Sequence, residues 1–590
     1  MNSIELLKSC TSRKHLARLL NSTPSHLTYI LFKMPEGTKY TQFPVTKKSG
    51  GIRQINAPSR ELKNLQKRLA KLLQDCVEDI NKANKYDDNA AHGFVRKRSI
   101  ITNAEMHKKQ KNVANIDLEN FFESFNFGRV RGFFIKNQHF ELNVDVATAI
   151  AQIACHNGSL PQGSPCSPVI TNLITHSLDI RLIQLAKKHS CIYSRYADDL
   201  TFSTRKAIFP PEILREENGE LVISKTLRNE IRRSGFSINS KKTRIQYKDS
   251  RQDVTGLVVN QKVNVSSDYA RLTKAMCNSL YTRGFYTKEV NGQLVHGTIK
   301  QLYGRLNFID SIDLHNRINY PEKLSVQYNH KSHGYRTRVL HNGREKTFSK
   351  LLFYRHFFAN PKVSVICEGK TDNIYLRCAL DSIGTQYPKL FTPAGNGKEA
   401  TTHIELFKYS KRTRFLMELY GGSSYLGGFI QSYQERLKDY KKLPLSKPVI
   451  ILLDNDDGLS KHIKTEMKNA KCTIYINGSI VVNFDKNIKK ADFVHITDNL
   501  YAVLTPLKAD GSDSMIEDFF TNAVLERKVN GRTFDPKEEK KPADKYYNKN
   551  TFATQVIEAD KKNIDFDGFK AIFDRITLAI NHFEQREANK

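Results

Sequence analysis

The stretch YSRYADDLTFS, residues 193–203, places two adjacent acids between two short runs rich in aromatic, β-branched and small residues. Such runs favour strands, and the short acidic segment between them predicts a hairpin. A tight turn would carry the carboxylates of Asp198 and Asp199 to the tip of that hairpin. The segment therefore predicts a sheet that presents two acids at one edge.

A third acid, Asp117, ends the apolar run VANID, residues 113–117. If this run is a neighbouring strand, three carboxylates converge. Clustered carboxylates repel one another unless cations neutralise them, and Mg²⁺ prefers oxygen ligands. Two such ions can activate a hydroxyl and stabilise a leaving pyrophosphate in an in-line displacement. An isolated Asp-Asp pair is usually a solvated turn, but the flanking strands and Asp117 make this pattern more specific.

The motif Tyr196-Ala197-Asp198-Asp199 and the strand-terminal Asp117 resemble the catalytic motifs of reverse transcriptases, and the resemblance extends from about residue 25 to about residue 310. It implies an α+β right-hand polymerase with fingers, palm and thumb. It also implies a two-metal Mg²⁺ site held by Asp117, Asp198, Asp199 and the backbone carbonyl of Leu118.

Five further residues match nucleotide-binding positions of that family: Arg53, Phe122, Gln162, Gly163 and Lys242. The resemblance implies that Phe122 crowds a ribose 2′-hydroxyl and that Gln162 and Gly163 lie in the loop under the incoming nucleotide. Arg53 would bind the triphosphate, and Lys242 would lie near the pyrophosphate. Without the resemblance, Phe122 could equally be a core aromatic. Arg53 and Lys242 would then be interpreted as solvated surface side chains.

Two smaller motifs indicate the type of reverse transcriptase. The pattern NAxxH occurs at residues 103–107 and VTG at residues 254–256, in the order typical of bacterial retron enzymes. This resemblance implies a protein that uses dNTPs to copy part of its own structured noncoding RNA (msr-msd). The implied product is a branched RNA–DNA molecule (msDNA) that stays with the protein.

A second group of acids comes after apolar runs in the C-terminal part of the chain. Glu368 ends the run VSVIC, and Asp454 and Asp456 come after PVIILL. Apolar runs that alternate with amphipathic stretches predict an α/β domain with a largely parallel sheet. Ligands gather at the carboxyl ends of strands in such sheets, so the three acids could share one Mg²⁺ pocket. Acids in these places can also simply cap the next helix.

This pair of motifs resembles the TOPRIM domain over roughly residues 361–525. The resemblance implies that Asp454 and Asp456 hold Mg²⁺, while Glu368 assists proton transfer or joins the metal ligands, in a nuclease that acts on nucleic acid. The whole chain resembles a retron reverse transcriptase fused to a TOPRIM effector, as in Ec67-type retrons, and thus an antiphage toxin module. The alternatives are an intron-type or diversity-generating reverse transcriptase, or an inactive TOPRIM-like module that recruits a separate effector.

The formal net charge of +32 is unevenly spread, because residues 1–350 hold 56 basic and 30 acidic side chains. Such an excess indicates a surface that neutralises nucleic-acid phosphates. We divide the chain into a polymerase at 1–310, a basic connector or thumb extension at 311–360 and the effector at 361–590. No stretch is apolar enough to span a membrane, which predicts a cytoplasmic protein. The oligomeric state is left open, a homo-oligomer included.

Overall fold

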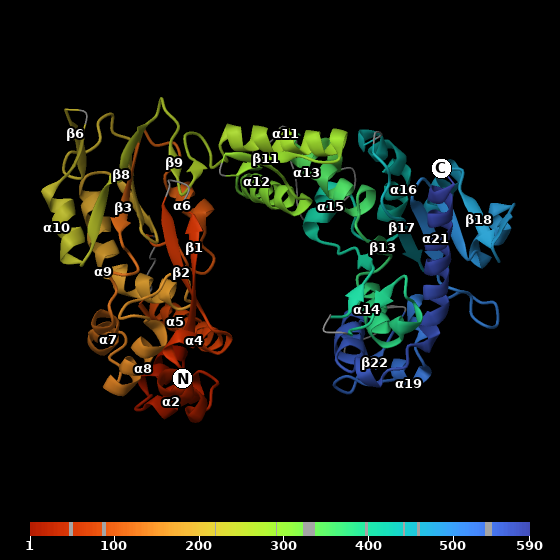
Figure 1. The fold of residues 1–590 in the computed structure, drawn as a ribbon, viewed down its shortest axis with the longest axis horizontal. Coiled ribbons are helices and arrows are strands. Elements are labelled where there is room, and N and C mark those ends of the chain that lie inside the picture. Colours follow the sequence, from red (N-terminus) through yellow and green to blue (C-terminus); the bar gives the residue numbers. More distant parts are fainter. Residues whose placement is uncertain are drawn as a thin grey trace. The chain divides into compact units, whose positions relative to one another are not determined.

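The computed structural model describes residues 1–46, 51–84, 90–218, 220–290, 292–321, 337–395, 399–440, 443–456, 459, 461–536 and 545–589. The chain forms two compact units, Met1–Ser266 and Ser267–Lys590. We describe each unit by itself (Figure 1).

The N-terminal unit surrounds its central sheet with helices. Its longer helices are α5 (Arg60–Asn84), α7 (Phe127–Lys136), α8 (Val144–Ala154), α9 (Ser167–Lys188) and α10 (Lys225–Arg233), and its shorter ones are α1 (Ser3–Lys8), α2 (Arg13–Leu19), α3 (Pro24–Thr28), η1 (Tyr29–Lys33), α4 (Glu36–Lys39) and α6 (Ile100–Met106). Helix α8 has seven buried residues among eleven, so it forms part of the core rather than of the surface.

The central sheet of this unit has four antiparallel strands in the order β4-β5-β3-β8. These strands are β3 (Asn112–Glu119), β4 (Ile192–Tyr196), β5 (Asp199–Thr204) and β8 (Ser237–Tyr247). Two-stranded sheets are formed by β1 (Tyr40–Thr46) with β2 (Ile52–Pro58), by β6 (Leu214–Glu217) with β7 (Glu220–Ile223), and by β9 (Asp253–Val254) with β10 (Leu257–Val258). The central sheet therefore contains both sequence segments that carry the first acid group.

The C-terminal unit begins with α11 (Ser267–Arg283), the hairpin of β11 (Thr287–Val290) and β12 (Gln293–His296), and α12 (Ile299–Asn319). These elements fall within the predicted polymerase domain, yet they pack with later helices of the C-terminal unit. Those later elements include η3 (Thr337–Leu340), α13 (Gly343–Phe353), η4 (Tyr354–Phe358) and α15 (Lys411–Met417), and α13 contacts α11, α12 and α15.

The predicted connector at 311–360 differs from the structure in its second half, while its residues 322–336 lie outside the described residues. Helix α13 is a core element: Phe348, Leu351 and Phe353 are at most 3 % exposed. The buried Glu345 carboxylate accepts hydrogen bonds from Arg317 of α12 and from Arg412 of α15. The basic residues of the predicted connector therefore include Arg317, a partner of a buried acid.

The main sheet of the C-terminal unit has seven strands in the order β16-β13-β17-β21-β20-β18-β19. They are β13 (Val363–Cys367), β16 (Ile404–Leu406), β17 (Val449–Leu453), β18 (Thr473–Ile476), β19 (Ser479–Val481), β20 (Phe493–Thr497) and β21 (Leu500–Leu504). The first four in spatial order are parallel, and the other neighbours are antiparallel. The sheet is thus mixed, not largely parallel, because tight turns at Asn477-Gly478 and at Asp498-Asn499 make antiparallel hairpins of β18–β19 and β20–β21.

Helices α14 (Asp372–Ile383), α16 (Ser423–Leu437), α17 (Lys461–Asn469) and α21 (Lys570–Ala588) accompany this sheet, and α21 packs on β20 and β21. The remaining short elements are η5 (Gly384–Gln386), β14 (Phe391–Thr392), β15 (Thr401–Thr402), η6 (Lys438–Tyr440), α18 (Phe484–Asn487), η7 (Ile488–Lys490), η8 (Ile516–Phe519), α19 (Asn522–Leu525), β22 (Thr533–Phe534), β23 (Tyr546–Tyr547), α20 (Lys549–Thr551), η9 (Phe552–Glu558), η10 (Lys561–Asn563) and η11 (Asp567–Phe569).

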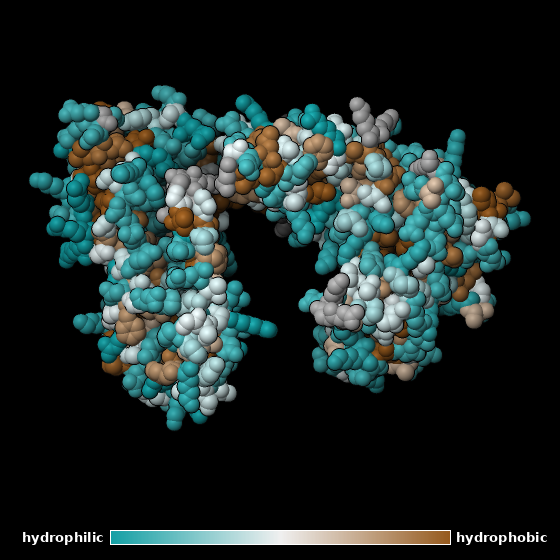
Figure 2. All heavy atoms as spheres, viewed as in Figure 1, coloured by the Kyte–Doolittle hydropathy of each residue, from teal (hydrophilic) through white to brown (hydrophobic). Residues whose placement is uncertain are grey.

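The surface seen in Figure 2 is mostly hydrophilic on both units. Among the described residues, no helix is both long and apolar enough to cross a bilayer. All nine cysteines are free thiols.

Candidate active sites

The two acids of the predicted hairpin lie where β4 turns into β5. Asp199 pairs with Tyr196 across the hairpin and with Asp117 on β3, and the backbone N–H of Leu118 donates to the carbonyl of Asp198 over 3.0 Å. The structure therefore brings Asp117, Asp198 and Asp199 together at one edge of the central sheet. Leu118 lies at the same edge.

The turn needs a close neighbour without a side chain. Ala197 adopts a left-handed conformation with φ of 56°. A Cβ atom added to Gly93 would lie 2.6 Å from the backbone nitrogen of Ala197, which is too close for any side chain. Glycine at position 93 thus lets the segment of residues 90–94 support the tip of the hairpin from the side.

The electrostatics of this edge favour a bound cation. Partial desolvation, together with the charges of Asp198 and Asp117, raises the pKa of Asp199 to about 6. Desolvation and the Asp117 charge also raise the pKa of Asp198, while Arg53 and Lys242 oppose this shift. The Lys242 ammonium lies 3.0 Å from Oδ2 of Asp117. Both predicted phosphate-binding cations therefore act on the same acid group, and Lys242 pairs directly with one member.

The loop with Gln162 and Gly163 lies against strand β2, which carries Arg53. The backbone N–H of Asn56 donates to the carbonyl of Gln162 over 2.8 Å. Gly163 has φ of 118°, and a Cβ there would meet the Asn56 carbonyl at 2.6 Å. Only glycine allows this close approach. The contact fixes the loop to strand β2, which carries Arg53, the residue predicted to bind the triphosphate.

Phe122 lies at the border of the aromatic core. Its neighbour Phe121 is 2 % exposed and stacks on Phe236, whereas Phe122 is half-buried and meets Phe121 edge to face at 5.6 Å. Phe121 therefore fills the core position, and the ring of Phe122 keeps a solvent-accessible face. This placement suits a residue that contacts a substrate better than one that only packs.

We expect Phe122→Val to increase ribonucleotide incorporation relative to deoxynucleotide incorporation, because the smaller side chain leaves room for a 2′-hydroxyl. The measurement is the ratio of kcat/KM values for matched rNTP and dNTP substrates. Phe121→Val is the control, since the loss of a buried ring should cost about 2–4 kcal/mol of stability without changing that ratio. An unchanged ratio in a stable Phe122→Val protein would show that Phe122 only packs.

The NAxxH and VTG motifs lie beside the hairpin strands. His107 is buried, its Nδ1 lies 2.7 Å from Oγ of Ser203 on β5, and its Nε2 lies 2.7 Å from Oγ of Ser194 on β4. Ser194 in turn donates to Asn103. The hydroxyl of Thr255, the central residue of VTG, donates to the carbonyl of Ile100 on the same helix, α6. The NAxxH motif therefore holds α6 on β4 and β5, and the VTG motif holds the same helix on the β9–β10 turn.

Burial lowers the pKa of His107 to about 3. An unfolded histidine titrates near 6.5, so the unfolded state binds more protons between these values. Stability from the neutral imidazole is present above pH 6.5 and is lost as the pH falls toward 3. We expect the unfolding free energy to fall by about 1 kcal/mol per pH unit below pH 6, measured by urea unfolding. The decline should be shallower in His107→Gln; an equal decline would exclude His107 as its source.

The second predicted acid group also assembles at the carboxyl ends of parallel strands. Strands β13 and β17 are neighbours, and the backbone N–H of Asp454 donates to Oε2 of Glu368 over 3.3 Å. Oδ1 of Asp454 accepts a hydrogen bond from the Ile516 backbone. Asn455, between the two aspartates, is fully buried, whereas Asp454 and Asp456 are half-buried.

Burial and mutual repulsion shift the titration of this second group strongly. Burial and the charges of Asp372, Glu517 and Glu368 raise the pKa of Asp454 to about 8. Burial and the charges of Asp456 and Asp372 raise the pKa of Glu368 to about 7. Acids arranged in this way favour either protonation or a bound cation.

Sequence reasoning assigned no role to two residues beside this group. Glu517 is 1 % exposed, and its carboxylate lies 3.1 Å from the ammonium of Lys549. Burial lowers the pKa of Lys549, but Glu517, Asp454 and Asp372 outweigh it and raise the pKa overall. Glu517 is not preceded by an apolar run, and Lys549 lies far along the chain, so the apolar pattern that located the other acids indicated neither position.

Both acid groups fit Mg²⁺ only if other ligands complete its coordination. Among the described residues, no three His, Cys, Asp or Glu side chains have the spacing to hold a metal ion by themselves. Mg²⁺ usually keeps several waters and binds one or two carboxylates plus substrate phosphates. In the first group, Oδ2 of Asp117 contacts the Lys242 ammonium at 3.0 Å.

A family model described as reverse transcriptase (RNA-dependent DNA polymerase) matches residues 45–265, which include the whole first acid group. The retron Mx162 and Mx65 reverse transcriptases of Myxococcus xanthus are 32 % and 34 % identical to the chain, over 52 % and 40 % of its length. The chain spans 65 % and 55 % of these two relatives.

The retron Ec86 reverse transcriptase of Escherichia coli is 32 % identical over 296 residues, which are 49 % of this chain and 82 % of that relative. The region matched by the family model contains the first acid group, the loop and the two small motifs described above. By this similarity, the chain belongs to the retron reverse transcriptase family.

Proposed function

We propose that the N-terminal unit, with the helices after it, is an RNA-directed DNA polymerase that makes msDNA from its own noncoding RNA. The observation that carries this proposal is the convergence of Asp117, Asp198 and Asp199 on one sheet edge, with Arg53 and Lys242 acting on it. Mg²⁺ bound by these acids would supply charge stabilisation for phosphoryl transfer.

The residues of the chain then have separate tasks. Arg53 and Lys242 neutralise phosphate oxygens. When substrate enters, the Lys242 ammonium leaves the Asp117 carboxylate and contacts a phosphate instead. Gly163 holds the loop that carries Gln162 on β2, beside the proposed nucleotide site. Phe122 limits the space beside the sugar. The template is RNA, and the substrates are deoxynucleoside triphosphates.

We expect binding of the noncoding RNA to weaken steeply with salt, because residues 1–350 hold 56 basic against 30 acidic side chains. A protein that contacts 6–10 phosphates loses roughly 10³–10⁵-fold in affinity between about 50 and 200 mM salt. Filter binding over this range with the full chain gives the slope. A nearly flat slope would contradict charge-driven binding.

We also propose that residues 361–590 form a Mg²⁺-dependent TOPRIM nuclease, the antiphage effector of the retron. The support is the second acid group at the carboxyl ends of β13 and β17, with the pKa of both Glu368 and Asp454 raised. Asp454 and Asp456 would hold the cation. Glu368, with a pKa of about 7, can accept and return a proton near neutral pH.

A further inference from the structure

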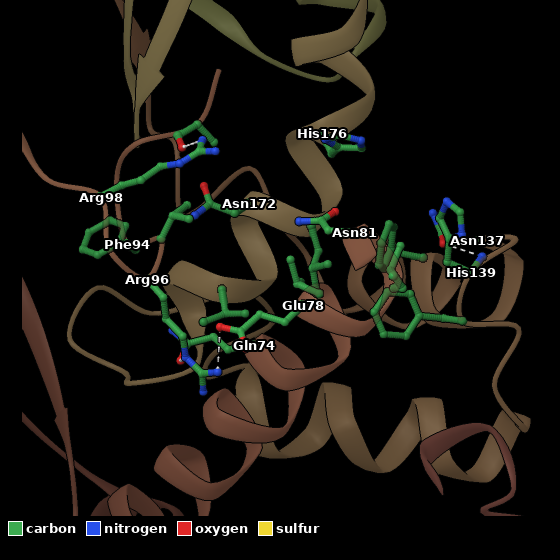
Figure 3. A pocket seen from close by; sticks show the side chains of 18 residues that line it. Gln74, Glu78, Asn81, Phe94, Arg96, Arg98, Asn137, His139, Asn172 and His176 are labelled. Carbon is green, nitrogen blue, oxygen red and sulfur yellow. Dashed lines mark hydrogen bonds and ion pairs between the residues drawn. The ribbon is translucent and has the colours of Figure 1, made fainter. Parts of the chain in front are cut away.

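The N-terminal unit contains a cavity of about 280 Å³ that neither proposed active site uses. It lies between α5, α9 and the loop of residues 91–98 (Figure 3). This volume is close to the lower end of ligand pockets, roughly 300–1,000 Å³. Its apolar wall includes Phe133, Phe140 and Leu173, and its polar wall includes Asn81, Asn172 and His176. A small, flat group with polar edges suits such a cavity.

Asn81 offers unused hydrogen-bonding capacity to an occupant. Its side chain is half-buried near the end of α5, close to Asn172 and His176 in Figure 3. It has no hydrogen-bond partner among the described residues. An asparagine amide carries donors and an acceptor, and it pairs with the edge of a nucleobase when one is presented to it.

Phe94 lies at the entrance of the cavity in a strained conformation. Its φ is 61°, unusual for an aromatic residue, and the residue is 46 % exposed. Lys97 in the same loop has φ of 62°. Strained non-glycine residues persist where they serve a ligand site, and exposed aromatic rings are the surfaces on which unpaired bases stack.

The loop that carries Phe94 touches the catalytic hairpin. The Gly93 carbonyl accepts a hydrogen bond from Asn172, and Asn172 accepts one from Arg195 of β4. Arg195 also donates to the carbonyl of Ala197 in the turn. An occupant of the cavity would therefore lie against the segment that supports Asp198.

We infer that this cavity binds a nucleobase. The base stacks on Phe94 and pairs with the free amide of Asn81. Its source is either an unpaired base of the bound RNA or a free nucleotide, and the chemistry of recognition is shared. The inference depends on the proposed polymerase function only in so far as RNA is the source.

The absence of tryptophan from the chain provides a direct test. Phe94→Trp introduces a single indole at the entrance, and Phe32→Trp places one at an exposed position of the same unit outside the cavity. We expect an unstructured eight-nucleotide RNA, or the four nucleoside monophosphates, to quench the emission of the Phe94→Trp protein. Quenching by RNA alone assigns the site to an RNA base, and quenching by monophosphates assigns it to a free nucleotide.

A second measurement uses the native aromatic. We expect Asn81→Leu to weaken binding of the quenching ligand about five-fold in equilibrium dialysis, the equivalent of one hydrogen bond. Asn84→Leu, on the same helix but outside the cavity lining, should leave the affinity unchanged.

Quenching must persist in the Phe94→Trp, Asp198→Asn double variant, which separates base binding from DNA synthesis. The inference is overturned if neither ligand quenches, if Phe32→Trp is quenched equally, or if Asn81→Leu binds as tightly as Asn84→Leu.

Discussion

Asp199→Asn, and likewise Asp198→Asn, is expected to lower DNA synthesis by about a thousandfold or more while leaving the fold intact. Each change removes a charge from a carboxylate group that a metal pair requires, and metal stabilisation of the transition state is worth several kcal/mol. Because the acids repel one another, their neutralisation should not destabilise the protein. The assay is the branched RNA–DNA product on a denaturing gel, with thermal unfolding as the test of folding.

Asp249→Asn is the matched control for these variants, because Asp249 lies in an exposed turn at the other end of β8. It should synthesise DNA at the native rate. Normal synthesis by both Asp198→Asn and Asp199→Asn would refute the polymerase site. A parallel loss of activity and thermal stability would instead indicate a structural role for the acids.

The second large effect is expected in the C-terminal unit. Glu368→Gln, or Asp454→Asn combined with Asp456→Asn, should abolish metal-dependent hydrolysis, toxicity and antiphage protection. Glutamine cannot accept a proton, and the asparagines remove the charges that would bind the cation. Synthesis of the branched product should stay within about twofold of the native rate, because phosphoryl transfer there uses a different set of acids.

Asp485→Asn, at an exposed position on α18, is the control for charge removal in the same unit. Three readouts are compared in each strain: branched product, growth after induction, and phage plaque number. Full phage protection by the triple variant of Glu368, Asp454 and Asp456 would place the effector chemistry elsewhere. Loss of protection with loss of the branched product would mean that the two sites are not independent.

Local sequence was sufficient to predict the hairpin at 193–203 and the strand ending at Asp117. Alternating apolar residues and a short acidic turn are local signals, and the structure has β4, β5 and β3 at these places. The same holds for β13 and β17, each a buried apolar run with an acid directly after it. The roles of these acids remain predictions.

Other features could not be predicted because they depend on partners distant in sequence. Whether Phe121 or Phe122 fills the core is decided by Phe236, on a different segment of the chain. The basic segment near residue 345 was predicted to be part of a connector or thumb extension. Its core position could not be predicted because its acidic partners and helix neighbours lie elsewhere in the chain. Three antiparallel strand pairs turned the predicted parallel sheet into a mixed one, through hairpins that the apolar pattern alone did not reveal.

The sequence by itself determined the two acid groups, their strands and the basic character of residues 1–350, because periodicity, turn chemistry and charge are properties of neighbouring residues. Only the tertiary structure decided that Lys242 pairs with Asp117, that Glu517 and Lys549 lie beside Asp454, and that a cavity adjoins the catalytic hairpin. These features arise where segments far apart in the chain pack together. The pKa shifts have the same origin, because desolvation depends on the atoms that surround a group in space.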